Sequence, residues 1–438
     1  LFLFHTGSMP YEDYVEVELE WFCQSPLKLV DQDGREMPYQ RIHTAAKVRH
    51  TTLGGRRRFV FYASIPACGF VQYSVVKEKP SLESTPHMEI EKPDALRLEN
   101  AYLLAEFDAR TGMLSSLTDK KTGYNALTGA ASLRMYADER DAWGHIQGRR
   151  YEDLHVDFRL DCIEKVESGK LREVIRVRLF YEDTRLEQLY YLGARERELR
   201  VENRLTFNHR WHLLKLAYPV GADVVETRAE AAYGTVCRTI RDDVEYNMQR
   251  FLDISDGAGS GLAIANDGKY AFNVEEGRVQ ITAVRSAIYA QGNSPDWWNE
   301  QETYEYTDIG SQTFWLVLKP HGDVLPEREL YRIADKIGGA YEYLGDSAHA
   351  SSGRGRQVWN RFSLGRVEAE NVSLVLVKKA EDDGDFVLRL LETEGKDTST
   401  RLHFRGESYP VFVGHHEIVT YKISRDGRKI QKTDLLEL

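Results

Sequence analysis

Short runs of alternating apolar and polar residues dominate this chain, and they predict strands. Residues 14–20 alternate strictly, as a strand with one buried face does. Similar patterns recur between residues 98 and 205 at a spacing of about ten residues. Turns are predicted at 31–34 in the N-terminal part and at 108–112. Evenly spaced short strands of this kind predict an all-β protein built around a large antiparallel sandwich.

One segment has a helical pattern instead. Apolar Leu330, Ile333 and Ile337 recur at intervals of three or four residues, and Pro326 suits the first turn of a helix. We therefore expect a helical segment over residues 326–344. Strand patterns return after it, and the polar-apolar tail from residue 430 predicts an edge strand.

The length of 438 residues exceeds what one hydrophobic core usually supports, so two or three domains are expected. A polar, proline-bearing stretch marks a linker. The predicted parts are a small β domain (1–78), the linker (79–93), a large β domain (94–325), a helix-and-loop connection (326–357) and a C-terminal β domain (358–438). The first residue is Leu, and we interpret the chain as a fragment of something longer.

Charge, hydropathy and cysteine content narrow the kinds of partner and the cellular compartment that we expect. A net charge of −11 argues against nucleic acid or an anionic membrane as the main partner. No apolar run approaches the roughly 18 residues of a membrane span, and the opening four residues are too short for a signal peptide. The four cysteines are scattered without a C-x-x-C pair, which is typical of thiols in a reducing compartment. We expect a cytoplasmic protein.

Residues 261–286 predict a three-stranded meander. An apolar run is followed by Asn266-Asp267-Gly268, which suits a hairpin because these residues tolerate positive φ. A strand with Tyr270 and Phe272 comes next, then a turn at 275–277 and a last strand ending at Arg285. An arginine is an unusual end for such an apolar strand.

Two loops rich in acidic and aromatic residues could bind a sugar together with Arg285. Residues 293–298 contain Asp296 and two tryptophans, and residues 136–145 contain Asp141 and Trp143. A guanidinium beside carboxylates and indoles can hold sugar hydroxyls and stack against a sugar face. The plain alternatives are a surface arginine at a strand end and a structural polar loop.

Motifs for other chemistry are absent from the sequence. There is no G-x-S-x-G and no H-E-x-x-H pattern. His209 and His212 flank Trp211, and on a strand this spacing would direct them to opposite faces, so we expect no shared metal. The residues alone therefore indicate no metal site and none of these catalytic signatures.

Taken together, several weak motifs resemble the C-terminal β-region of bacterial-type family 38 α-mannosidases. They occur in the family's order and span nearly the whole chain. They are 261–270, Ile281–Ser286, Asp141-Ala142-Trp143, His212–Lys215, Tyr233-Gly234-Thr235 with Arg238, Asp308-x-Gly310, Pro320-His321-Gly322 and Lys378–Asp382.

The resemblance implies a fold and a division of labour. The middle domain would be a galactose-mutarotase-like supersandwich. Enzymes that resemble this chain have an N-terminal α/β domain with the aspartate nucleophile and a zinc site. By this resemblance, the nucleophile and the zinc site would lie upstream of Leu1. The intact enzyme would be a retaining hydrolase of terminal α-mannosides in a mannose-containing glycan or oligosaccharide. Arg285, with Asp141 and Trp143 behind it, would line the pocket.

Some residues depart from the family pattern and leave substrate preference open. Gln312 stands where His is common, Ala287 replaces a proline, and residues 237–240 lack the usual R-P-T-H. One alternative is a non-catalytic carbohydrate-binding or assembly module. A mutarotase-type epimerase would need paired His and Glu in one cleft, which no spacing here supports. Linkage preference and a homo-oligomeric state stay open.

Overall fold

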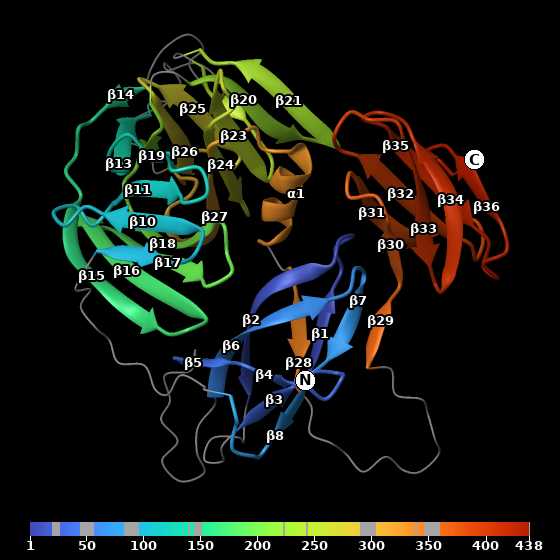
Figure 1. Cartoon of the computed structure of the whole chain (residues 1–438). Helices are drawn as coiled ribbons and strands as arrows, with labels where there is room; N and C mark the ends of the chain where they lie inside the picture. The colour runs from blue at the N-terminus through green and yellow to red at the C-terminus, as the bar shows by residue number, and fades with distance from the viewer. Residues whose placement is uncertain are drawn as a thin grey trace. The chain divides into compact units, whose positions relative to one another are not determined.

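The computed structural model describes most of the chain, and its fold is all-β. The described residues are 1–19, 27–43, 57–82, 96–138, 141–143, 151–221, 224–241, 244–289, 304–337, 340–345 and 360–437. Among them a single α-helix, α1 (Glu327–Asp335), accompanies the strands (Figure 1). Two compact units form: one comprises Leu1–Met88, Gly169–Leu171 and Pro326–Leu438, and the other Glu89–Ser168 and Arg172–Leu325. The predicted all-β class is confirmed.

The second unit is a large antiparallel sandwich. Its nine-stranded sheet has the order β15 (Arg159–Ser168), β16 (Arg172–Tyr181), β17 (Thr184–Gly193), β18 (Leu199–Phe207), β27 (Gly310–His321), β24 (Gly261–Asn266), β23 (Phe251–Asp256), β20 (Val224–Ala231), β21 (Gly234–Thr239). Its six-stranded sheet has the order β14 (Glu152–Asp153), β13 (Ser132–Ala137), β19 (His212–Pro219), β26 (Arg278–Arg285), β25 (Ala271–Glu275), β22 (Tyr246–Asn247).

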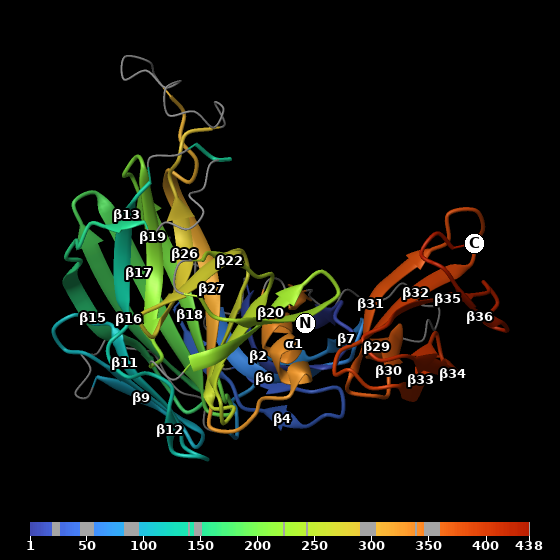
Figure 2. The ribbon, with the colours of Figure 1, turned by 90° about the horizontal axis from the view of Figure 1, so that it is seen from above.

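One core joins these sheets. Leu214 and Leu216 of β19 and Leu262 and Ile264 of β24 belong to the same buried cluster. A smaller sheet contributes to it as well, with the order β12 (Tyr124–Asn125), β11 (Leu114–Asp119), β10 (Leu103–Phe107), β9 (Arg97–Glu99). Figure 2 shows β13, β19 and β26 as one layer beside β16–β18. The predicted sandwich, and the predicted turn at 108–112 between β10 and β11, are confirmed.

Among its described residues, the first unit contains smaller sheets around two large hydrophobic clusters and one small one. Residues of its N-terminal part form β28 (Glu342–Leu344)-β1 (Phe2–His5)-β7 (Gly69–Gln72)-β29 (Arg361–Ser363), then β2 (Tyr11–Leu19)-β6 (Arg57–Ile65)-β5 (Gln40–Ile42), and β4 (Glu36–Met37)-β3 (Lys28–Val30)-β8 (Ser74–Val76). The C-terminal part forms β30 (Gly365–Val367)-β33 (Thr398–Phe404)-β34 (Glu407–Val413) and β31 (Val372–Lys379)-β32 (Phe386–Glu392)-β35 (Ile418–Ile423)-β36 (Ile430–Thr433). The predicted edge strand in the tail is β36.

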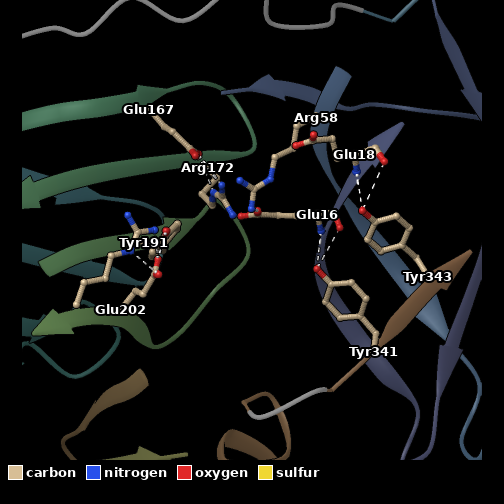
Figure 3. Close-up of polar contacts among 10 residues, drawn as sticks. Glu16, Glu18, Arg58, Glu167, Arg172, Tyr191, Glu202, Tyr341 and Tyr343 are labelled. Atoms are coloured by element: carbon tan, nitrogen blue, oxygen red, sulfur yellow. Dashed lines mark hydrogen bonds and ion pairs between the residues drawn. The ribbon is translucent and has the colours of Figure 1, made fainter. Parts of the chain in front are cut away.

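The predicted helix over 326–344 is wrong in its second half. Helix α1 ends at Asp335, and residues 342–344 form β28, which pairs with β1. Tyr341 and Tyr343 alternate as strand residues do, and their hydroxyls accept hydrogen bonds from the backbone N–H groups of Glu16 and Glu18, at 2.7 and 3.2 Å (Figure 3). Two consecutive glycines in the sequence, which lie outside the described residues, also disfavour a continuing helix.

The predicted meander is wrong at its first turn. β24 pairs with β23 and β27, whereas β25 pairs with β26 in the other sheet, so Asn266-Asp267-Gly268 connects the two sheets. The Asn266 side chain accepts hydrogen bonds from the N–H groups of Gly268 and Lys269, and Asp267 accepts one from Trp315 of β27. These bonds fix the connection against β27 and leave no hairpin there.

The second turn of that stretch is a true hairpin. Glu276 and Gly277 both have positive φ, at 50° and 69°, between the paired residues Glu275 and Arg278. Two positive φ values are typical of the tight turns that join antiparallel strands. The predicted turn at 31–34 between β3 and β4 also forms. The predicted domain boundaries stay predictions, since residues 83–95 and 346–359 lie outside the described part.

Candidate functional site

Arg285 lies at one end of the six-stranded sheet, where β26 ends, and β19 separates it from the end of β13. Residue pairing places it beside Leu213 of β19, and Leu213 beside Tyr136 of β13. The Arg285 Nε donates to Asp138 Oδ2 at 2.5 Å, and Nη2 to Asp138 Oδ1 at 3.3 Å. The Asp138 side chain is fully buried and that of Arg285 is 23% exposed. A buried carboxylate therefore fixes a guanidinium that ligands can still reach.

Backbone oxygens complete the setting of this guanidinium. Nη2 of Arg285 donates to the Asp141 carbonyl at 3.1 Å, and Nη1 lies 3.5 Å from the Ala142 carbonyl. The Ala142 N–H in turn donates to the carbonyl of Ile288 at 2.7 Å, just beyond β26. The Arg285 N–H donates to the Asp308 carboxylate at 3.0 Å. The segment 141–142 and the end of β26 are thus held together at this point.

The charges in this cluster are well defined. Burial alone would lower the pKa of Arg285, but the hydrogen bond and charge of Asp138 outweigh it and raise that pKa. Burial also raises the pKa of Tyr151 to about 12; the Arg285 charge lowers it by a smaller amount, and the Asp138 charge raises it. Near neutral pH the cluster therefore combines a permanent cation with a neutral phenol.

Trp143 stands out from the surface beside this cluster. Trp143 is 77% exposed, whereas Asp141 is buried and only 7% exposed. The backbone N–H of Trp143 donates to Asp141 Oδ1 at 3.0 Å, which fixes the Trp143 backbone next to the segment that Arg285 contacts. The three predicted residues Arg285, Asp141 and Trp143 therefore lie together. An exposed indole near a fixed cation can stack against a sugar ring whose hydroxyls accept from the cation.

Sequence reasoning missed Asp138 as the partner of Arg285. Asp138 lies in the predicted binding loop 136–145, but nothing local marks it among several acidic residues there. The two residues are 147 positions apart, and only the pairing of β13, β19 and β26 brings them together. The other predicted loop, 293–298 with Asp296, lies outside the described residues.

A buried lysine lies near the same end of the sheet. Lys215 is 1% exposed, and its Nζ donates to Asn273 Oδ1 at 2.8 Å and to the Glu245 carboxylate. Its ammonium lies 5.5 and 5.8 Å from the rings of Tyr136 and Tyr151. Burial lowers the pKa of Lys215, and Glu245 opposes that effect. Charges of both groups act on Tyr151, since Arg285 lowers its pKa and Glu245 raises it, so Tyr151 links the Lys215 network to the Arg285 cluster electrostatically.

The expectation that His209 and His212 point to opposite faces is wrong. β18 ends at Phe207 and β19 begins at His212, so His209 lies in the connection, where Trp211 has a φ of 60°. The two imidazole rings are 5.4 Å apart. Burial, followed by the charge of His212, lowers the pKa of His209. In the described part of the chain, no group of three or more His, Cys, Asp or Glu residues could hold a metal ion.

A second ion cluster surrounds His321 of the Pro-His-Gly motif. Its Nδ1 faces the carbonyls of Asp323 at 2.9 Å and Gly259 at 3.1 Å, and its Nε2 faces Asp253 Oδ1 at 2.8 Å. Burial lowers the pKa of His321, but the hydrogen bond and charge of Asp253 outweigh it and raise that pKa. Arg228 donates to the other oxygen of Asp253 at 3.0 Å. This cluster anchors the segment that follows β27.

Comparison with known proteins assigns the middle of the chain. Residues 98–296 match the family model described as "Glycosyl hydrolases family 38 C-terminal domain". This part of the chain is similar to the C-terminal domain of glycosyl hydrolase family 38. The match includes every described residue of the Arg285 cluster from Asp138 to Arg285 itself. The family 38 assignment from the sequence motifs is thereby confirmed.

Individual proteins that are similar to this chain extend the comparison. Alpha-mannosidase G of Dictyostelium discoideum is 22% identical over 384 residues, which cover 80% of this chain and 32% of that protein. An alpha-mannosidase from Enterococcus faecalis V583 superposes with a TM-score of 0.74 at 13% identity, over 97% of this chain and 56% of that one. A family 38 protein from Enterococcus faecalis gives a TM-score of 0.75 at 12% identity, over 97% of this chain and 58% of that one.

These figures have two consequences. At such low identity, the solved structures show that the fold is shared and no more. The chain also spans 32% of the curated relative and just over half of each solved one. In addition, no helix among the described residues is long and apolar enough to cross a membrane.

Proposed function

We propose that this chain is the C-terminal region of a retaining α-mannosidase and that it completes the active site of an upstream catalytic region. The family 38 match and the α-mannosidase relatives support the substrate class, a terminal α-linked mannose of a glycan or oligosaccharide. The observation that carries the proposal is Arg285, held by the buried Asp138 beside the exposed Trp143.

The geometry of Arg285 suits binding rather than bond cleavage. A guanidinium fixed by a carboxylate and two carbonyls loses little conformational freedom when a ligand arrives, which favours an oriented contact. Its proposed role is to donate to a sugar hydroxyl or to a catalytic carboxylate of the upstream region. Trp143 would cover one face of the sugar.

The carboxylates of the cluster have supporting roles in this proposal. Asp138 is fully buried and paired with Arg285, so its proposed role is to position the guanidinium. Asp141 is almost fully buried and its Oδ1 accepts from the Trp143 backbone. The nucleophile and the acid/base, a pair of carboxylates about 5 Å apart in retaining enzymes, would belong to the upstream region.

Zinc is proposed for the upstream region alone. When bound, it would hold and orient hydroxyls of the mannose ring. The described residues offer no cluster of three ligands for it, so no step of the proposal for this chain depends on zinc.

The first test compares this chain with the polypeptide extended upstream to its natural start. Both would be assayed for hydrolysis of 4-nitrophenyl α-mannoside, with and without a chelator. We expect turnover by the extended form only, and its loss with the chelator. Turnover by this chain alone would contradict the placement of the nucleophile, and Asp141 and Asp296 would then be the first carboxylates to replace.

The alternative function is a non-catalytic carbohydrate-binding module, favoured by the exposed Trp143. It predicts that this chain alone binds mannose or a mannoside and that the extended polypeptide does not hydrolyse one. A titration of this chain with methyl α-mannoside, monitored by Trp fluorescence, together with the hydrolysis assay separates the binding-module function from the α-mannosidase function. Binding without hydrolysis by the extended form would favour the module.

A further inference from the structure

A tryptophan with a strained backbone lies beside the Arg285 cluster. Trp211 belongs to the connection between β18 and β19 and has a φ of 60°. A bulky residue rarely adopts this left-handed conformation, and residues that do so concentrate at catalytic and ligand-binding sites. Two backbone hydrogen bonds enforce it here, because the Trp211 N–H donates to the Ser286 carbonyl and the Trp211 carbonyl accepts from the Asp138 N–H, both at 2.9 Å. Trp211 is therefore fixed between the carboxylate partner of Arg285 and the residue that follows Arg285.

The Trp211 ring packs against a second aromatic residue that is tied to Arg285. Its centroid lies 5.5 Å from that of Tyr306, with the rings nearly perpendicular at 88°. The exposed Arg210 places its guanidinium 5.2 Å from the centroid of the Tyr306 ring. Just after Tyr306 in the sequence, Asp308 accepts a hydrogen bond from the Arg285 N–H at 3.0 Å. We call Arg210, Trp211 and Tyr306 the Trp211 group.

Packing of the sandwich does not account for the Trp211 group. The core cluster that joins the two sheets includes neither Trp211 nor Tyr306 among its described residues. Both residues are partly exposed. Aromatic surface that is held rigidly beside charged and polar groups is typical of ligand-binding sites. A ligand therefore explains the strained backbone of Trp211 better than packing does.

The chemistry of the Trp211 group fits a sugar. Aromatic rings cover the apolar face of a sugar, and an exposed guanidinium donates to its hydroxyls. In the proposed function, Trp143 and Arg285 contact a terminal mannose, which is linked to the rest of the glycan only through its anomeric carbon. A further sugar contact beside that site therefore falls on the sugar that carries the mannose. We propose that Trp211 and Tyr306 bind this second sugar, which hydrolysis releases as the leaving group. The inference rests on the proposed function.

Two substrates that differ in the second sugar test the proposal. Wild type, Trp211→Ala and Trp315→Ala of the upstream-extended polypeptide would be assayed for kcat/KM with an α-linked mannobiose and with α-mannosyl fluoride, which has no second sugar. Trp315 is the matched control, since it is also partly exposed and its ring lies 5.3 Å from that of Tyr191. Tyr306→Ala provides a second probe if Trp211→Ala lowers the folding yield.

We expect Trp211→Ala to lower kcat/KM for mannobiose at least about tenfold and that for α-mannosyl fluoride less than about twofold. Trp211→Phe should retain most of the mannobiose activity because it keeps an aromatic ring, and Trp315→Ala should change neither value. Equal losses on the two substrates would overturn the proposal and leave Trp211 with a structural role. An unchanged kcat/KM for mannobiose in a folded Trp211→Ala variant would overturn it too.

Calorimetric titration of the same proteins with mannobiose and with methyl α-mannoside requires no hydrolysis. Weaker binding of mannobiose alone in Trp211→Ala, in a polypeptide that hydrolyses neither substrate, would refute the proposed function and keep the second-sugar contact. Hydrolysis whose preference for mannobiose does not depend on Trp211 would do the reverse. A folded wild-type polypeptide that neither binds nor hydrolyses mannobiose would overturn both.

Discussion

Removing either partner of the Arg285–Asp138 pair should destabilise the sandwich, but unequally. Asp138 has no exposed side-chain surface, whereas 23% of the Arg285 side chain is exposed. In Asp138→Ala the guanidinium can turn toward water. In Arg285→Ala the Asp138 carboxylate loses its paired cation and stays buried. A buried carboxylate without a paired cation costs more free energy than a guanidinium that can reach water.

The magnitudes follow from this asymmetry. Breaking a buried ion pair typically costs about 3–5 kcal/mol. We expect a loss near that range for Arg285→Ala and about 2 kcal/mol for Asp138→Ala, where solvent compensates the remaining charge. The double variant should lose less than the sum of the two, by about 1–3 kcal/mol, because the two residues contact each other directly.

Urea unfolding of the 438-residue chain, carried out on both single variants and the double variant, measures these values. Arg278→Ala is the control, since Arg278 lies on the same strand but its side chain and that of its partner Glu276 are 34% and 65% exposed. It should change stability by less than about 0.5 kcal/mol. Additive losses in the double variant, or a larger loss for Asp138→Ala than for Arg285→Ala, would refute the reasoning.

Two further predictions concern buried charges elsewhere. Burial lowers the pKa of His321, but Asp253 outweighs this and raises it, so the resulting stability should be present below the unfolded pKa of roughly 6.5 and lost as pH rises through the higher folded value. Thermal melts across this pH range should show the loss, and His321→Gln should flatten the profile; an equally steep profile in the variant would contradict the assignment. Burial raises the pKa of Glu392, but hydrogen bonds from the N–H groups of His416, Glu394 and Lys396 and from the Asn371 side chain outweigh it and lower that pKa. Its stabilisation should hold above the unfolded pKa and disappear as pH falls through the lower folded value, and Glu392→Ala should cost about 2–4 kcal/mol in urea unfolding at neutral pH, whereas a loss below 1 kcal/mol would show that water replaces those donors.

Local patterns predicted the strands well, because alternation along one strand reflects its own two faces. β2 and the β25–β26 hairpin were recovered in this way. Alternation does not state which sheet a strand joins, so β24 was assigned to the wrong neighbour. The helix was overextended because Ile337 fits a helical spacing, while the alternating Tyr341 and Tyr343 indicate a strand.

The site was predicted in part for a similar reason. The family motifs pointed to Arg285, Asp141 and Trp143, which the structure places together. The partner that fixes Arg285 is contributed by a strand far away in sequence. Finding Asp138 requires the register of three strands, which depends on long-range packing rather than on any motif.

The most direct test of the central claim is kcat/KM for α-mannoside hydrolysis by the upstream-extended polypeptide carrying Arg285→Lys. Lysine keeps the charge but lacks the planar fork that Asp138 and the two carbonyls hold. The account predicts a loss of at least about 100-fold, equivalent to roughly 2.7 kcal/mol of transition-state stabilisation, with Arg278→Lys unchanged and both variants folded. Wild-type kcat/KM in a folded Arg285→Lys variant would contradict the claim that Arg285 completes the active site.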